Sequence, residues 1–144
     1  MARRELLEYL NVALSYELAG VIQYLQHSFL VGGEDREVYR TFFRGLANEA
    51  HLHAEILGDK IVALGGMPTV EPAIVRQSSE LIEMLRQSLQ LEREAMAGYM
   101  SAWSACDEID LPQKFWLEGQ ISDEQMHIEE LEKLCREKSS GATR

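Results

Sequence analysis

Glycine pairs and prolines, the residues that most often interrupt helices, are confined to three places in this sequence. One glycine pair is Gly32-Gly33, a second pair at 65–66 is followed by Pro68 and Pro72, and the third proline is Pro112. Glycine commonly follows the end of a helix, and proline is tolerated mainly in its first turn. Between these breaks, apolar residues recur at steps of three and four, the spacing of one helix face. The chain is therefore expected to be all-α.

The breaks divide the chain into four helices, expected over residues 4–30, 35–64, 79–107 and 111–138. The connection at 66–78 is much longer than the other two. A helix of roughly 28 residues is about 42 Å long, and a 13-residue connection reaches about 43 Å when extended. The sequence thus predicts one domain over residues 1–144, a four-helix bundle of two antiparallel hairpins joined by a long crossover.

The charge balance limits the partners of this chain. Asp and Glu total 24 against 14 Lys and Arg, a net charge of −10, so nucleic acid would be repelled and cations attracted. No stretch approaches the ~20 uninterrupted apolar residues of a membrane span, and no apolar run follows the basic N-terminus. We expect a cytoplasmic protein with no membrane or nucleic-acid partner. Its two cysteines are too few for a disulfide scaffold or paired CxxC motifs.

Three acidic residues interrupt the apolar stripes of the expected helices. Glu17 has Ala13 and Val21 one turn away on either side, and Glu92 and Glu124 are flanked in the same way. A charge on the buried face of a helix is costly unless it is paired or bound to a metal ion. Three such acids are therefore hard to explain as solvated positions.

Two histidines accompany acids on the same helix faces. Glu124 and His127 are three residues apart, and Glu49 and His53 are four apart. With the other two acids this makes four carboxylates, about −4, which two divalent cations would neutralise. Mixed oxygen and imidazole ligation suits iron or manganese, and zinc can compete. For Glu49 alone, a solvated helix face is the alternative interpretation.

The two halves of the chain also repeat a spacing. Tyr24 follows Glu17 by seven residues, and Tyr99 follows Glu92 by seven. Matching halves predict a site with approximate twofold symmetry. Tyr99 is then either the counterpart of Tyr24 or an ordinary core residue, and the sequence leaves both interpretations open.

These motifs resemble those of the ferritin-like di-iron carboxylate proteins, and of bacterioferritins in particular. The likeness is carried by the run 10–27, with Glu17 and the pair Gln23-Tyr24, by Leu91-Glu92, and by the segment 123–128, Asp-Glu-Gln-Met-His-Ile. It covers roughly residues 5 to 135. The resemblance implies two iron ions in the bundle core. It makes Glu17, His53, Glu92, Glu124 and His127 iron ligands, and it makes the Tyr24 hydroxyl a hydrogen-bond donor to a ligand carboxylate.

The sequence departs from the bacterioferritin pattern at two positions. The family has an acid three residues before the histidine of the second helix, where this chain has Ala50; Glu49 is the candidate replacement. His51 occupies the position of the methionine that binds haem in bacterioferritins. It is a candidate haem ligand, and an exposed or interfacial histidine without haem is the favoured interpretation.

The resemblance implies that the chain oxidises Fe(II) with O2 or peroxide, as an iron-handling oxidoreductase of the ferroxidase type. One alternative is a rubrerythrin-like peroxidase, or a manganese di-metal oxidoreductase, that needs a separate electron donor. Another is a non-catalytic iron-binding or structural bundle, which Ala50 favours. Subunits of this kind pair along exposed faces, so at least a homodimer is expected.

Overall fold

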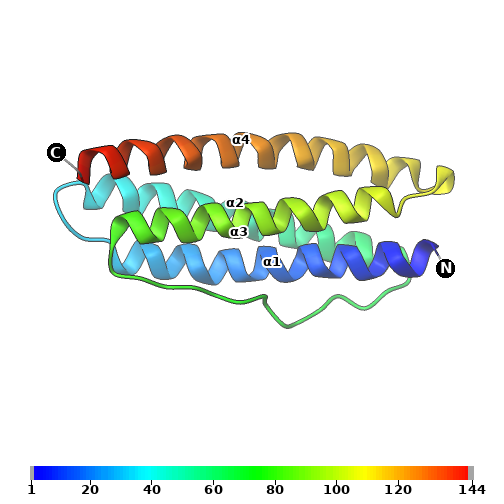
Figure 1. Cartoon of the computed structure of the whole chain (residues 1–144). Coiled ribbons are helices and arrows are strands. Elements are labelled where there is room, and N and C mark those ends of the chain that lie inside the picture. The colour runs from blue at the N-terminus through cyan, green and yellow to red at the C-terminus, as the bar shows by residue number, and fades with distance from the viewer. Residues whose placement is uncertain (1, 143–144) are drawn as a thin grey trace.

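The computed structural model describes residues 2–142 and contains the expected four long helices (Figure 1). They are α1 (Ala2–Leu30), α2 (Arg36–Ala63), α3 (Leu81–Ser104) and α4 (Leu111–Ala142), and a short 3-10 helix, η1 (Glu108–Asp110), precedes α4. α1 and α2 form one antiparallel hairpin, and α3 and α4 form the other. The predicted all-α four-helix bundle of two hairpins joined by a long crossover is confirmed.

Helix ends differ from expectation on the C-terminal hairpin. The third helix begins at Leu81 and ends at Ser104 rather than spanning 79–107. Its early end is explained by Asp107 and Asp110, which cap each other's backbone around η1. The fourth helix continues beyond residue 138 to Ala142. Its last turns are held against the start of α2, since the Lys138 Nζ lies 3.4 Å from an oxygen of Asp35.

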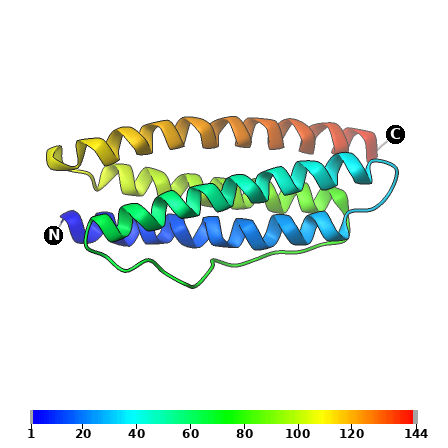
Figure 2. The same cartoon turned by 180° about the vertical axis from the view of Figure 1, so that it is seen from behind.

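The crossover between α2 and α3 runs along the outside of α1 from one end of the bundle to the other (Figures 1 and 2). It leaves α2 through Gly65, whose positive φ of 88° favours glycine. Polar groups of α1 then hold it: the Asn11 side chain bonds the backbone of Met67 and Thr69, and Gln23 accepts from the Arg76 amide at 2.9 Å. Unpaired backbone groups of an extended segment thereby find partners.

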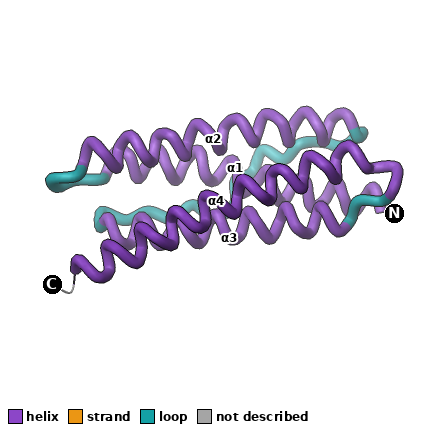
Figure 3. The backbone as a smooth tube through the Cα atoms, turned by 90° about the horizontal axis from the view of Figure 1, so that it is seen from above, coloured by secondary structure: helices purple, strands orange, loops and turns teal. Residues whose placement is uncertain are grey.

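Two apolar clusters fill the bundle, one toward each end. One contains Tyr24, Phe43 and Met84, and the other contains Leu10 and Ile61. α1 packs against α2 and α3, whereas no Cα atoms of α2 and α4 come within 8 Å of each other. Figure 3, which shows the bundle from above, shows that the helices cross at shallow angles. Among the described residues, no helix has the length and apolar character needed to cross a membrane.

Candidate metal centre

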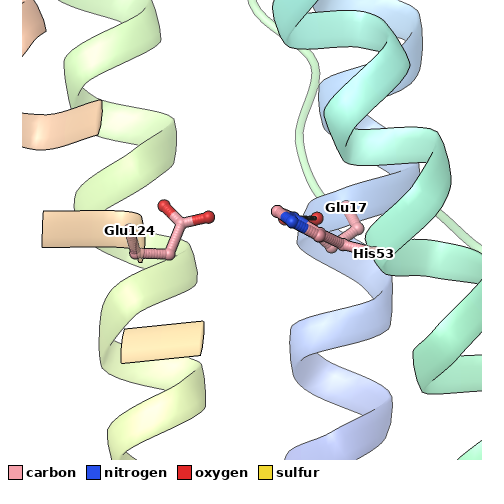
Figure 4. Close-up of side chains that lie close together, drawn as sticks. All are labelled: Glu17, His53 and Glu124. Carbon is pink, nitrogen blue, oxygen red and sulfur yellow. Dashed lines mark hydrogen bonds and ion pairs between the residues drawn. The ribbon is translucent and has the colours of Figure 1, made fainter. Parts of the chain in front are cut away.

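Three acidic side chains are buried in the middle of the bundle. Glu17 on α1, Glu92 on α3 and Glu124 on α4 are all buried, and Glu124 is only 1% exposed. Figure 4 shows the Glu124 carboxylate pointing toward Glu17 and His53, which come from the opposite hairpin. The acids that interrupt the apolar stripes in the sequence thus converge in space.

The described residues form two overlapping groups that could hold metal ions. One comprises Glu17, His53 and Glu124, the other Glu92, Glu124 and His127, and within each group one ligand atom per residue lies within 4.8 Å of the others. Glu124 belongs to both groups. A carboxylate has two oxygens and can therefore serve two neighbouring cations.

Within the part of the chain that the structure describes, two buried atoms of these groups have no hydrogen-bond partner and are therefore available to a cation. Among the described residues, Glu124 Oε2 and His127 Nδ1 are buried without a hydrogen-bond partner. Leaving buried polar atoms unpaired is costly, and both atoms are metal-ligand types. A cavity of about 10 Å³ lies between them and the other acids. The donor set of carboxylates and imidazoles suits iron or manganese.

Glu17 and His53 form one polar pair across α1 and α2. The Glu17 Oε2 lies 2.8 Å from His53 Nδ1. Burial raises the pKa of Glu17 to about 7, although the hydrogen bond and charge of His53 oppose this shift. Burial acts to lower the pKa of His53, but the hydrogen bond and charge of Glu17 outweigh it and the pKa is raised. The metal-free pair therefore shares a proton near neutral pH.

Glu92 and Glu124 form a second pair, to which Tyr24 is added. Burial, followed by the charge of Glu92 and a hydrogen bond with it, raises the pKa of Glu124 to about 12. The Glu92–Glu124 pair therefore holds a proton in the metal-free chain. The Tyr24 hydroxyl donates to Glu92 Oε1 at 2.6 Å, and burial and the Glu92 charge raise the pKa of Tyr24 well above its ordinary value.

Glu49 lies at the rim of this cluster rather than inside it. Its side chain is 50% exposed, and its Oε2 lies 2.7 Å from His127 Nε2 across the space between α2 and α4. A surface pocket of about 410 Å³ opens there, lined by Glu49, Leu52, His53, Asp123, Met126 and His127. Glu49, His53 and His127 line both this pocket and the inner cavity. The cluster is thus reached from the surface between α2 and α4.

Gln120 is a buried site residue that the sequence analysis missed. It lies on α4 one turn before Glu124, and its Nε2 is 3.1 Å from Nδ1 and 3.3 Å from Nε2 of His53. The available signal was its spacing: a polar residue four positions before Glu124 shares that residue's helix face. The two chemically distinct ends of its amide allow it to donate to or accept from the ring.

The two positions that depart from the bacterioferritin pattern have different surroundings. Ala50 is buried at a close approach of α1 and α2, where a Cβ placed on Gly20 would lie 3.1 Å from the Ala50 Cβ. His51 is exposed and lies outside the cluster, with its Nδ1 3.0 Å from Glu55. The buried cluster therefore contains no carboxylate from the Ala50 position, and His51 faces outward.

Comparisons with known proteins identify the family of this chain. A family model described as a ferritin-like domain matches residues 7–139. A bacterial ferritin from Pseudomonas aeruginosa is 31% identical over 123 residues, covering 83% of this chain and 78% of its own.

Solved structures give the same result. A ferritin-like, diiron-carboxylate protein from Bacillus anthracis has a TM-score of 0.89 and 33% identity, covering 94% of this chain and 98% of its own. Rhodobacter capsulatus bacterioferritin, whose structure was described with a metal-free dinuclear site and haem iron, has a TM-score of 0.83 and 29% identity over 92% of this chain and 84% of its own. The chain therefore belongs to the ferritin-like domain family, and the resemblance to bacterioferritins is confirmed.

Proposed function

We propose that this protein binds two iron ions in the bundle core and oxidises Fe(II) with O2 or peroxide. The observation that carries the proposal is the pair of buried Glu/His groups that share Glu124. Two neighbouring iron ions can together supply two electrons to one oxidant molecule. An oligomer of at least two subunits and a cytoplasmic location are part of the same proposal.

The residues have separate roles in this proposal. Glu17, His53 and Glu124 hold one ion, and Glu92, Glu124 and His127 hold the other. Binding would displace the protons that the Glu17–His53 and Glu92–Glu124 pairs hold in the metal-free chain, because a metal ligand must be deprotonated. The hydrogen bond from Tyr24 orients Glu92. The apolar clusters on either side exclude water from both ends of the centre, which leaves the pocket between α2 and α4 as its opening.

Glu49 serves entry as well as binding. Its half-exposed carboxylate lines the surface pocket together with the acidic Asp123, so the mouth of the site attracts cations. From there, Glu49 can pass Fe(II) to His127, which it already contacts at 2.7 Å. This makes Glu49 a rim ligand that replaces the missing Ala50 carboxylate only for the ion bound by His127.

The test is anaerobic titration of the metal-free chain with Fe(II), followed by O2 or H2O2 and an absorbance scan. We expect saturation at about two ions per chain, because two groups share the core, and a new near-ultraviolet band after the oxidant. Faster reaction with peroxide than with O2, with iron retained through repeated cycles, would favour the rubrerythrin-like alternative. Restoration of turnover by Mn(II) alone would favour the manganese alternative.

Variants make this test specific to the cluster. Glu92→Ala and His127→Ala should each remove the ion bound by the group of Glu92, Glu124 and His127. Glu129→Ala, at an exposed position on the same helix as His127, should bind iron as the unaltered chain does. An unaltered chain that binds no iron would refute the proposal. A haem band that is lost in His51→Ala would identify the exposed His51 as a haem ligand.

A second candidate function is iron binding without turnover. Ala50 favours it, because the group that contains His53 has only Glu17 as a carboxylate that it does not share with the other group. Saturation at about one ion per chain, with no oxidation band, would select this function.

Gln120 provides a test of the ion bound by Glu17, His53 and Glu124 alone. Gln120→Leu removes the only amide that contacts the His53 ring among the described residues, so binding of one ion should weaken by roughly 10- to 100-fold. The other ion should be unaffected. Stepwise Fe(II) titration measures both affinities, and Gln125→Leu, an exposed change on the same helix, is the control. Equal weakening of both ions would contradict this assignment.

A further inference from the structure

Tyr99 is a fully buried residue of α3 whose hydroxyl has no role in the site described above. Its exposed fraction is 0%, and its hydroxyl has no hydrogen-bond partner among the described residues. The ring packs edge-on against Trp116, with centroids 6.2 Å apart. A buried hydroxyl normally finds a partner, since leaving it unpaired is costly. The apolar contacts of the ring account for a phenylalanine here but not for a tyrosine.

The internal repeat of the chain indicates where this hydroxyl belongs. Tyr24 follows Glu17 by seven residues on α1, and its hydroxyl crosses to Glu92 on α3 at 2.6 Å. Tyr99 follows Glu92 by the same seven residues, two helical turns along the same face. Because α1 and α3 pack against each other, the symmetric counterpart of the Tyr24 bond would run from Tyr99 to Glu17.

In the metal-free chain, Glu17 forms a hydrogen bond with His53 rather than with Tyr99. Its Oε2 lies 2.8 Å from His53 Nδ1. If that nitrogen binds a metal ion it carries no proton, so Glu17 loses its hydrogen-bond donor on loading. Burial, and then the charges of Glu17, Glu124 and Glu92, raise the pKa of Tyr99 well above its ordinary value, so its hydroxyl keeps its proton. A neutral phenol beside carboxylates can act as a donor to one of them.

We propose that Tyr99 is a second positioning residue of the metal site, and that its hydroxyl donates to the Glu17 carboxylate in the metal-loaded protein. The Tyr99 hydroxyl would then replace the hydrogen-bond donor that Glu17 loses when His53 Nδ1 binds the metal ion. The two halves of the site would each have one tyrosine, Tyr24 for Glu92 and Tyr99 for Glu17. This inference rests on the proposed function, because it requires that metal ions load the cluster.

The test compares two properties of Tyr99→Phe in the 144-residue chain. In the metal-free protein the change removes only an unpaired hydroxyl, so the melting temperature should stay the same or rise by a few degrees. In the loaded protein a hydrogen bond to a ligand is lost, so affinity for one of the two ions should fall by roughly 10- to 100-fold. Co(II) titration followed by visible absorbance measures the affinity independently of catalytic turnover.

Two other tyrosines supply matched controls. Tyr24→Phe removes a bond that already exists in the metal-free chain, so it should lower both the melting temperature and the Co(II) affinity. Tyr9→Phe, at an exposed position of α1, should change neither. A lower melting temperature for metal-free Tyr99→Phe, or an unchanged Co(II) affinity, would overturn the inference. Failure of the unaltered chain to bind Co(II) or Fe(II) would instead refute the proposed function.

Discussion

Glutamine in place of Glu124 should abolish tight binding of both metal ions, with a loss of more than about 100-fold in each affinity. The reason is that Glu124 belongs to both Glu/His groups, and a neutral amide is a poor substitute for a carboxylate that serves two cations. The change should have little effect on the stability of the metal-free chain. The Glu92–Glu124 pair already holds a proton, since burial and the charge of Glu92 raise the pKa of Glu124, so the melting temperature should stay within a few degrees. Fe(II) titration and thermal unfolding measure the two quantities.

Comparable changes elsewhere make this result informative. Glu130→Gln alters an exposed acid of the same helix and should leave both affinities intact. Glu92→Gln should weaken chiefly the ion shared with His127, because Glu92 belongs to one group only. If Glu124→Gln retained one tightly bound ion, the idea of a carboxylate shared by two ions would be wrong.

Metal-free protein should become more stable at high pH, relative to the unaltered chain, when Glu17 is replaced by glutamine. The folded pKa of Glu17 is about 7 against an ordinary value of 4.5. A raised folded pKa gives stability that is fully present below pH 4.5 and is lost as the pH rises through 7. The lost amount is about 3 kcal/mol. Glutamine does not titrate, so the difference in unfolding free energy between the two chains should grow by this amount between pH 4 and pH 8.

The difference between the two chains reports on Glu17 together with His53, whose pKa Glu17 raises, and excludes titrating groups outside this pair. Burial lowers the pKa of His27 to about 4, so its contribution runs the other way and is lost as the pH falls below 6.5. Both chains retain His27, and its effect cancels in the difference. Denaturant unfolding at each pH, with a chelator present, makes the measurement. Saturating Fe(II) under anaerobic conditions should reverse the order, because only the carboxylate binds the metal. A difference that is flat with pH would contradict a buried, protonated Glu17.

Much of the fold could be predicted from the sequence because the deciding features are local or depend only on length. The glycine pairs and Pro112 mark helix ends through backbone geometry alone. The crossover had to span the bundle because its reach matches the length of a helix. The exact ends of α3 and α4 were missed. The end of α3 depends on the reciprocal capping of Asp107 and Asp110, and such a contact is not periodic.

The candidate site divides in a similar way. Three acids on apolar stripes and a histidine one turn from Glu124 were visible by themselves, since a buried charge requires compensation wherever the helices happen to pack. The sequence alone thus determined an all-α bundle with carboxylates and imidazoles in its core. Only the tertiary structure decided that Glu124 serves both groups, that Glu49 lies at the rim, that Gln120 contacts His53, and that the Tyr99 hydroxyl has no partner. These four features depend on how far apart the helices lie and how they are rotated, and helical periodicity carries no information about either.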